Sequence, residues 1–325
     1  MSESEVKKKR ASKKRTSAHA ASARGVALTK PLNAPEGEQL APPLPAKAKS
    51  KPLAYNDIDV SRWRDYEHIE TGSLWQINGR DRQNGHQLDY HGNCVPQILT
   101  QLLTRYTKQD EVILDLFLGS GTSAIEAVNL GRKAVGVELK AEMAQYVRSK
   151  LEEQGKAEQV GIINGDSSNG DWTGRAIQRA LKGFEREAAQ FLFLHPPYAD
   201  IIRFSDSEND LSNATSTEDF LEMFEKVCQL GYDMLEPGRF AGLVIGDKYA
   251  DGELIPLGFL CMERMNRVGF KTKSIIVKNI SGNEKAKGRM SNLWRYRALV
   301  GGFYIFKHEY VFVMQKPKGK PRKGQ

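Results

Sequence analysis

The stretch VILDLFLGSGT, residues 112–122, has the pattern of a buried strand that ends in a glycine turn and leads into a helix. Near-continuous apolar residues are typical of a strand in a parallel sheet that is covered on both faces. Gly119 and Gly121 let the backbone of the turn approach a bound molecule closely, at the strand end where open α/β sheets bind ligands. Ala124 replaces the third glycine of the dinucleotide-binding pattern. The stretch therefore predicts a ligand site, although a tight turn without a ligand uses the same glycines.

Strand-like and helix-like segments alternate around this stretch. Strands are expected at residues 112–117, 134–139, 160–164, 191–194, 240–245 and 274–277. Helices are expected at residues 122–130, 140–154, 173–186, 218–234 and 253–268. This alternation predicts a single doubly wound α/β domain with a mostly parallel sheet. A last apolar run at 310–314 follows its predecessor with no helix expected between them, so the sheet should end in an antiparallel hairpin.

Charge is distributed unevenly along the 325 residues, whose formal net charge is +8. Residues 1–50 hold 11 Lys and Arg against 4 Glu and no aromatic residue, and residues 315–325 hold five Lys and Arg and no acid. Such segments bury too little apolar surface to offset the cost of ordering, which predicts disordered basic tails at 1–50 and 317–325 around a domain at 51–316. The run KKKRASKKR suits a nuclear-type address or an arm that grasps DNA, and equally a solubility tail.

Several protein classes are excluded by composition. No run approaches the roughly 18 apolar residues of a membrane helix, and the start lacks the apolar core of a secretory signal. Cys94, Cys228 and Cys261 are odd in number and far apart, so neither a disulfide framework nor a cysteine-based metal site is expected. A reducing location is therefore expected, either the cytoplasm with its nucleoid or, in a eukaryote, the nucleus.

Residues 115–122, DLFLGSGT, resemble the D-P-F-x-G-S-G-T cofactor motif of S-adenosylmethionine-dependent DNA amino-methyltransferases, with leucine in place of the proline. Further features follow the family's pattern. An acidic residue ends the next strand, where the family binds the ribose hydroxyls, and another follows the third strand, where the family contacts the adenine amine. The segment HGNCVP, residues 91–96, resembles the one under the methionine end of the cofactor. The resemblance implies S-adenosylmethionine as cofactor, bound by Pro96, Asp115, Phe117, Gly119, Ser120, Gly121, Thr122, Glu138 and Asp166.

Residues 195–198, HPPY, are similar to the [D/N/S]-P-P-[Y/F/W] motif of the same family, which methylates exocyclic amines of bases. Such an amine is a poor nucleophile because its lone pair is delocalised, and acceptors aimed at its protons localise that pair on nitrogen. The resemblance implies that the Pro196 carbonyl is one acceptor, in a loop stiffened by Pro197. It also implies that Tyr198 stacks on a flipped-out base, which needs the ring rather than the hydroxyl. His195 departs from the motif, yet a neutral imidazole has one acceptor nitrogen and could fill the place.

The resemblance covers roughly residues 88–316. It implies a seven-stranded sheet with a reversed seventh strand, which agrees with the expected terminal hairpin. The cofactor motif precedes the catalytic motif in this chain, whereas many relatives have the opposite order. The chain therefore resembles the circularly permuted arrangement of the family.

The function implied by the resemblance is site-specific DNA methylation at adenine N6 or cytosine N4, as in restriction-modification. Two alternatives stay open, namely an RNA base-amine methyltransferase that uses the same pocket and a catalytically dead nucleic-acid-binding relative. A cytosine-C5 methyltransferase is excluded, because its cysteine nucleophile typically follows a proline and none of the three cysteines does.

Contacts to the nucleic acid are expected from two segments, the loop 203–212 and the basic stretch KAKGRMSNLWRYR at 285–297. Interleaved cations and aromatic rings suit phosphate contacts and base stacking, although a loop that caps the core has the same composition. Residues 62–75 are expected to cover the cofactor cleft. The candidate nucleic-acid-binding residues are Lys285, Lys287, Arg289, Trp294, Arg295 and Arg297.

Overall fold

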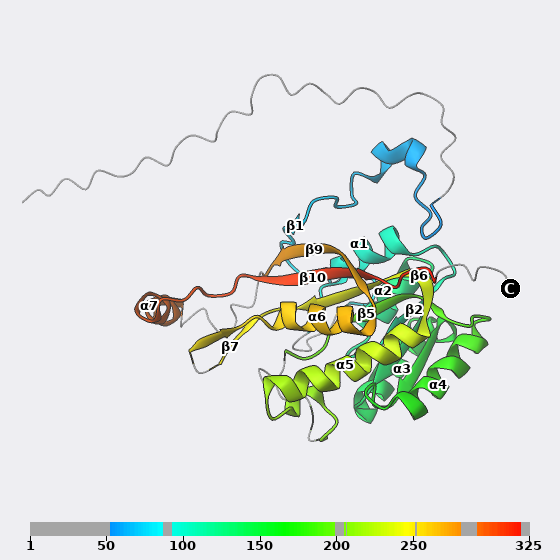
Figure 1. Cartoon of the computed structure of the whole chain (residues 1–325). Helices are drawn as coiled ribbons and strands as arrows, with labels where there is room; N and C mark the ends of the chain where they lie inside the picture. Colours follow the sequence, from blue (N-terminus) through cyan, green and yellow to red (C-terminus); the bar gives the residue numbers. More distant parts are fainter. Residues whose placement is uncertain are drawn as a thin grey trace, which may run out of the picture. The chain divides into compact units, whose positions relative to one another are not determined.

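Eight strands form the main sheet of the described chain, in the order β1-β9-β10-β6-β5-β2-β3-β4 (Figure 1). The computed structural model describes residues 53–86, 93–198, 205, 207–250, 252–280 and 291–319. The predicted disordered tail at 1–50 and residues 320–325 of the C-terminal tail lie outside these ranges. The strands are β1 (Leu74–Trp75), β2 (Val112–Asp115), β3 (Lys133–Glu138), β4 (Val160–Asn164), β5 (Ala189–Leu194), β6 (Leu235–Ile245), β9 (Lys271–Asn279) and β10 (His308–Gln315).

Neighbouring strands of this sheet pair in parallel except around β10, which runs antiparallel to both β6 and β9. The prediction of a mostly parallel sheet with one reversed strand is therefore confirmed. The sheet has eight strands instead of the seven expected, because β1 pairs with β9 at one edge. β1 has two residues, of which Trp75 is buried, and so short a strand has no periodicity that could be recognised in the sequence.

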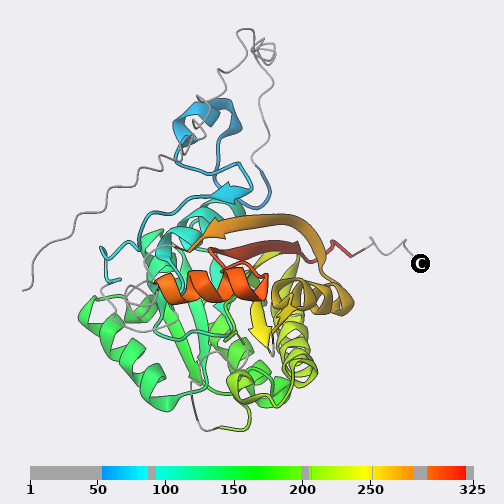
Figure 2. The same ribbon diagram turned by 90° about the vertical axis from the view of Figure 1, so that its left-hand side faces the viewer.

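Helices cover both faces of the sheet (Figure 2). Successive residues of a strand point to opposite faces. On β2, Ile113 therefore packs among residues of α1 to α3, whereas Val112 and Leu114 pack among residues of α4 to α6. No helix of the described part of the chain is long and apolar enough to cross a membrane. The helices are α1 (Pro96–Tyr106), α2 (Thr122–Asn129), α3 (Ala141–Glu153), α4 (Gly170–Gly183), α5 (Thr217–Met234) and α6 (Leu257–Val268).

Three local elements differ from the sequence prediction. Helix α7 (Ser291–Gly301) lies between β9 and β10, so their antiparallel pair is not the helix-free hairpin that was expected. Residues 253–255 form β8 (Glu253–Ile255), paired antiparallel with β7 (Lys248–Ala250), instead of the start of a helix. The residue before a proline avoids the helical region, and α6 accordingly begins only after Pro256. Helix α1 was not predicted, although Pro96 stands at its first turn, where a missing N–H costs little.

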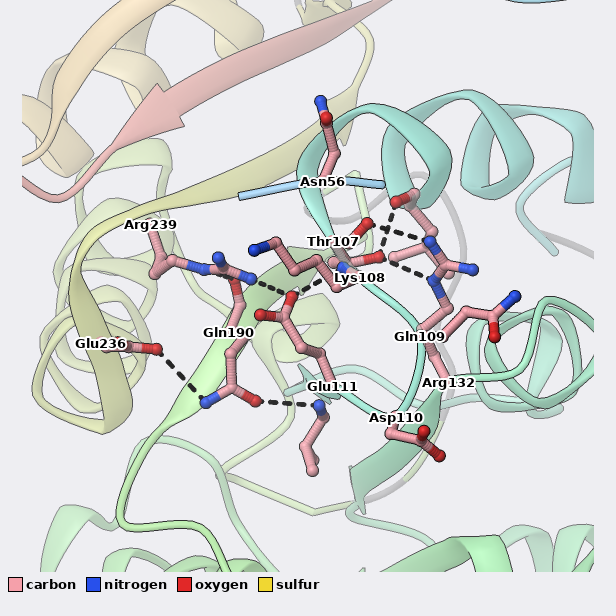
Figure 3. Close-up of polar contacts among 12 residues, drawn as sticks. Asn56, Thr107, Lys108, Gln109, Asp110, Glu111, Arg132, Gln190, Glu236 and Arg239 are labelled. Carbon is pink, nitrogen blue, oxygen red and sulfur yellow. Dashed lines mark hydrogen bonds and ion pairs between the residues drawn. The ribbon is translucent and has the colours of Figure 1, made fainter. Parts of the chain in front are cut away.

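Buried polar side chains join the amino ends of the central strands (Figure 3). Gln190 on β5 accepts a hydrogen bond from the backbone N–H of Val112 at 2.9 Å through its side-chain oxygen. Its backbone carbonyl accepts from the Arg239 side chain on β6 at 3.0 Å, and Arg239 also pairs with Glu111. These contacts lie at the edge of the sheet opposite to the glycine turn and the HPPY segment, and they fix β2, β5 and β6 relative to one another.

The two sequence motifs lie at the carboxyl ends of adjacent strands. From β2 the chain continues to β3 and β4 on one side, and it then returns to form β5 and β6 on the other side. Open α/β sheets have a crevice at such a topological switch point, outside the carboxyl ends of the strands. The glycine turn follows β2 and the HPPY segment follows β5, so both open toward this crevice.

Candidate active site

One cleft occupies the crevice, with about 970 Å³ of free space that is partly open to solvent. Its lining includes both motifs: the predicted residues that line it are Asp115, Phe117, Gly119, Thr122, Glu138, Asp166, His195, Pro196 and Pro197. Lys140 and Ser168 also line the cleft and were not predicted, whereas Asn93 and Cys94 belong to the predicted segment 91–96 and Asp210 to the predicted loop 203–212. Ser120, Gly121, Tyr198 and Pro96 were predicted but are not part of the lining.

Asp115 holds the glycine turn against the end of β2. Its Oδ1 accepts a hydrogen bond from the backbone N–H of Phe117 at 2.8 Å, and its Oδ2 accepts from the Ser123 hydroxyl. The side chain is 2% exposed, and this burial raises the pKa of Asp115 to about 7. The carboxyl group therefore changes its charge close to neutral pH, at the wall of the cleft.

Glu138 connects the end of β3 to the same turn. Its Oε2 accepts from the backbone N–H of Gly119 at 2.8 Å, and its Oε1 accepts from that of Lys140 at 2.9 Å. Burial raises the pKa of Glu138, and the two backbone donors act in the opposite direction. A carboxylate has about four acceptor positions, so each oxygen can still accept a further bond from a ligand in the cleft.

Asp166 and Asn93 line the cleft beside the turn. Asp166 Oδ1 accepts from the backbone N–H of Ser168 at 2.8 Å and from its hydroxyl at 2.7 Å. Asn93 Oδ1 accepts from the Ser120 hydroxyl, which places Ser120 behind the lining rather than in it. The Asn93 amide nitrogen is buried and has no hydrogen-bond partner among the described residues. Because a buried donor without a partner is costly, Asn93 is a candidate to donate to a bound ligand.

The two glycines of the turn have different surroundings. Gly119 has φ +52°, and a Cβ built there would meet no atom nearer than the Phe117 carbonyl oxygen at 3.9 Å. Gly121 begins α2 with φ +82°, and a Cβ there would lie 2.6 Å from Val147 Cγ1 of α3. A side chain at position 119 would therefore extend into the cleft, whereas one at 121 would collide with the core.

We expect Gly119→Asn to lose affinity for S-adenosylmethionine while the protein stays folded. Asn tolerates the left-handed conformation, so the backbone strain is small. Its side chain would occupy cleft volume, and overpacking of 1–3 kcal/mol corresponds to a loss of roughly 10-fold or more. Titration calorimetry measures the affinity. Gly121→Ala is the matched variant, and it should lower the unfolding temperature instead; equal cofactor affinity in Gly119→Asn and wild type would contradict the assignment of the turn.

His195 follows β5 directly and lines the cleft, where it is half-buried. Burial lowers the pKa of His195, and the carboxylate of Glu309 opposes this effect. The imidazole is therefore neutral at neutral pH and has an acceptor nitrogen. The prolines Pro196 and Pro197 continue the lining.

Tyr198 lies behind the lining, against β6 and β10. Its hydroxyl donates to Glu309 Oε2 at 2.7 Å. The ring stands nearly perpendicular to that of His195, with an interplanar angle of 79° and a centroid separation of 5.9 Å. The resemblance implied that only the aromatic ring of Tyr198 is needed, for stacking. In the structure the Tyr198 hydroxyl also has a partner, the carboxylate of Glu309.

Of the two segments predicted to lie over the cleft, the loop 203–212 lines it and residues 62–75 do not. Of the loop 203–212, Asn209, Asp210 and Leu211 line the cleft, whereas residues 203, 204 and 206 lie outside the described residues. Residues 62–75 do not line the cleft, contrary to the prediction. They contain most of an exposed 3₁₀ helix (Val60–Tyr66) and the whole of β1. β1 pairs with β9 at the edge of the sheet, where Trp75 is buried.

Only some of the candidate nucleic-acid-binding residues lie in the part of the chain that the structure describes. Lys285, Lys287 and Arg289 lie outside the described residues, as does the side chain of Trp294. Arg295 and Arg297 are exposed on α7, together with Tyr296 and several aliphatic side chains. The basic stretch, expected as a loop, is thus helical from residue 291 onward.

Comparisons with known proteins found partial matches in sequence and in structure. The family model described as DNA methylase matches residues 7–149, and the one described as conserved hypothetical protein 95 matches residues 94–220. The probable type III restriction-modification enzyme HindVI Mod subunit of Haemophilus influenzae is 22% identical over 190 residues, which are 57% of this chain and 22% of that protein. The type II methyltransferase M2.DpnII of Streptococcus pneumoniae is 36% identical over 55 residues, which are 17% of this chain and 20% of that protein.

The chain thus spans about a fifth of the length of these curated relatives. Among solved structures, the SAM-dependent methyltransferase from Geobacter sulfurreducens in complex with S-adenosyl-L-homocysteine is 16% identical. Its TM-score is 0.43, and the match covers 72% of this chain and 96% of that chain.

The fold and the cleft define a doubly wound α/β protein with a cleft at the topological switch point of its sheet. The sequence comparisons are more specific, because the family model described as DNA methylase matches residues 7–149 and the curated relatives include methyltransferases of restriction-modification systems. The residues matched by that family model include the glycine turn and Glu138 and end before the HPPY segment.

Proposed function

We propose that this chain is a DNA methyltransferase that transfers the methyl group of S-adenosylmethionine to an exocyclic amine of a flipped-out base, adenine N6 or cytosine N4. The observation that carries the proposal is that the glycine turn after β2 and the HPPY segment after β5 line the same cleft. The match of the DNA methylase family model to residues 7–149 supports it further.

The residues of the cleft fit the groups of S-adenosylmethionine. The ribose hydroxyls are two donors, and Glu138 offers two oxygens with remaining acceptor positions. The methionine end carries a carboxylate, and the buried Asn93 amide nitrogen is a donor without a partner beside the amino end of α2. Asp166 is an acceptor for the adenine amine, as the sequence motif implies. The acidic Asp115 suits the cationic sulfonium.

The catalytic role falls to acceptors at the end of β5. S-adenosylmethionine, when bound, supplies a methyl group on a cationic sulfur atom. The unprotonated ring nitrogen of His195 and the carbonyl oxygen of Pro196 accept hydrogen bonds from the two amine protons and thereby localise the nitrogen lone pair. Exchange of the S–CH3 bond for an N–CH3 bond would leave a neutral thioether and an amine with an extra proton, and neutral His195 is the acceptor placed to take this proton.

The test is a methylation assay on mixed substrates. Purified protein is incubated with DNA, RNA and methyl-labelled S-adenosylmethionine, and the nucleosides are separated and identified by mass spectrometry. Label in N6-methyladenine or N4-methylcytosine of DNA is the expected result. Label in RNA nucleosides alone would support the RNA enzyme instead, and cofactor binding without any transfer would support a catalytically dead relative.

An arm beside the cleft is the proposed DNA contact. We define the arm as β7, β8, α7 and residues 303–307, which connect to β6 and β10 at the carboxyl edge of the sheet (Figure 1). Tyr249 on β7 holds it together, since its ring stacks on Phe306 at 4.8 Å and its hydroxyl donates to the Tyr304 carbonyl at 3.2 Å. Residues 291–307 carry Arg295, Arg297 and Lys307 and no acid, so this part of the arm complements a phosphate backbone.

We expect the double variant Arg295→Ala/Arg297→Ala to bind DNA more weakly and with a smaller dependence on salt. Each lost phosphate contact reduces the slope of log affinity against log salt by about 1 and leaves the methylated base unchanged. Fluorescence anisotropy over a salt series measures the slope. Arg267→Ala is the control, because Arg267 is exposed near the end of α6 and pairs with Glu263. A slope equal to that of the wild type would argue against the arm as a phosphate contact.

A further inference from the structure

Three buried polar side chains join the HPPY segment to the outer strands of the sheet. The Tyr198 hydroxyl donates to Glu309 Oε2 at 2.7 Å, and Lys278 Nζ donates to Glu309 Oε1 at 2.8 Å. Lys278 is 3% exposed, and the side chain of Glu309 is 13% exposed. Each carboxylate oxygen of Glu309 therefore has its own donor, so the carboxylate is held from two sides.

The link extends across one complete strand. Glu309 on β10 pairs with Lys278 on β9 in the antiparallel register, and β6 lies between β10 and β5. Tyr198 leaves β5 and passes the end of β6 at Gly246, where a Cβ would lie 3.2 Å from the Tyr198 ring. The ring is thus confined by backbone on one side and fixed at its hydroxyl by Glu309.

The buried ion pair between Lys278 and Glu309 is better explained by its effect on local geometry than by a contribution to the stability of the fold. Two buried charges lose much of their attraction to the cost of removing them from water, so such a pair contributes little net stability. Removing one partner is costly, however, because the other charge is left buried and unpaired. Burial and the neighbouring carboxylate raise the pKa of Tyr198 well above its usual value, and the hydroxyl remains a donor.

We propose that Glu309, held by Lys278, is a positioning residue that fixes the Tyr198 ring and, through it, the HPPY segment whose His195 and Pro196 face the target base. This inference rests on the proposed function, since the target is the flipped-out base. The ring of Tyr198 lies 5.9 Å from that of His195, centroid to centroid. The Tyr198 ring lies behind the lining and against His195, so any rotation of the ring would shift the HPPY segment and with it the imidazole that must contact the target amine.

The hydroxyl of Tyr198 is therefore as important as its ring. Tyr198→Phe keeps the stacking surface but leaves Glu309 Oε2 buried without its donor. Glu309→Gln removes the charge, and a single amide oxygen cannot replace two carboxylate oxygens that each serve one donor. Both substitutions break the same link.

The experiment is a double-mutant cycle on methyl transfer by the full chain. Tyr198→Phe and Glu309→Gln should each lower kcat by roughly 10-fold, as expected for a hydrogen bond to a charged group, and the double variant should be no slower than either. Affinity for S-adenosylmethionine should stay unchanged. Tyr310→Phe is the matched control, because its hydroxyl donates to Asp247 Oδ2 at 3.1 Å outside the cleft lining. This control should keep the wild-type kcat.

The pH profile separates positioning from a general loss of structure. The charged groups that influence His195 are Glu309 on β10, Lys278 on β9 and Arg80 ahead of α1. Glu309→Gln removes the group that raises the pKa of His195, so the acid limb of the rate profile should move to lower pH. Tyr198→Phe changes no charge and should leave the limb in place. If Glu309→Gln does not fold because Lys278 is left unpaired, Lys278→Met/Glu309→Gln replaces the pair with neutral side chains and should show the same loss in kcat.

Additive losses in the double variant, or wild-type kcat in both single variants, would overturn the inference. An equal loss in Tyr310→Phe would overturn it as well, because the effect would then be general to this edge of the sheet. These outcomes require an active wild-type protein. A wild type that methylates no nucleic acid would overturn the proposed function itself, and the two failures are therefore distinguishable.

Discussion

His195→Ala should transfer methyl groups on the order of 10²-fold more slowly than the wild type, as found when one preorganised hydrogen-bond group is removed from an enzyme site. The variant loses the acceptor that localises the lone pair of the target amine. Its affinity for S-adenosylmethionine should be unchanged, because Asp115 and Glu138 belong to β2 and β3 and make no contact that depends on the imidazole. Single-turnover transfer from labelled cofactor measures the rate, and titration calorimetry measures the affinity.

The pH dependence of the wild-type rate gives the same residue a second test. Burial lowers the pKa of His195 from its usual 6.5, so the acid limb should lie below that value. The rate should fall as pH decreases through the lowered pKa, because protonation converts the acceptor nitrogen into a donor. Above this pKa the imidazole is neutral and the rate should stay level. Any residual activity of His195→Ala should lack this limb.

His195→Asp is the matched variant. It restores the common form of the motif and should retain activity, with the acid limb moved to lower pH because an aspartate has an ordinary pKa of about 3.9. Full activity in His195→Ala with an unchanged pH profile would contradict the acceptor role. In that case the carbonyl of Pro196 would remain as the principal activating group.

The central sheet and much of the cleft could be predicted because their signals are local in the sequence. The run 112–117 is apolar without interruption and ends in glycines, which specifies both a buried strand and the turn beyond it. Glu138 could be identified from its place at the end of the next strand. The register of parallel strands then brings these ends together, since β2 pairs with both β3 and β5.

Other contacts could not be predicted because they depend on pairing between distant segments. Glu309 reaches Tyr198 only because β10 inserts antiparallel between β6 and β9. Nothing at position 309 in the sequence distinguishes a buried carboxylate from an exposed one. Asn93 belongs to the segment that resembles the family, but only the folded structure, in which its side-chain oxygen accepts from Ser120, shows that its buried amide nitrogen has no partner among the described residues.

Asp115→Asn should make the protein more stable than the wild type at pH 8, by up to roughly 4 kcal/mol, and leave its stability nearly unchanged at pH 4. The wild-type carboxyl group is buried at the wall of the cleft, and its pKa is raised from 3.8 to about 7. An asparagine has the same shape. Its amide oxygen can accept from the Phe117 N–H, and its amide nitrogen can donate to the Ser123 hydroxyl oxygen, so both local contacts are retained.

The sign of this effect follows from proton binding. Between pH 4 and 7 the unfolded chain has released the proton of Asp115, whereas the folded protein still holds it. Stability therefore decreases as pH rises through this window, and the loss is complete only above the folded pKa of about 7. An asparagine does not titrate, so the variant lacks this contribution and its advantage over the wild type grows steadily with pH.

Urea unfolding of both proteins without cofactor, at constant ionic strength and at several pH values from 4 to 8, measures the difference. Asp171→Asn is the control, because it makes the same substitution at an exposed carboxyl group and therefore tests whether burial of the side chain is the cause. If the free energies of unfolding of the wild type and of Asp115→Asn differ by the same amount at every pH from 4 to 8, the raised pKa of Asp115 is contradicted. The Asp115 carboxylate would then be ionised throughout, stabilised by Phe117 and Ser123 despite its burial.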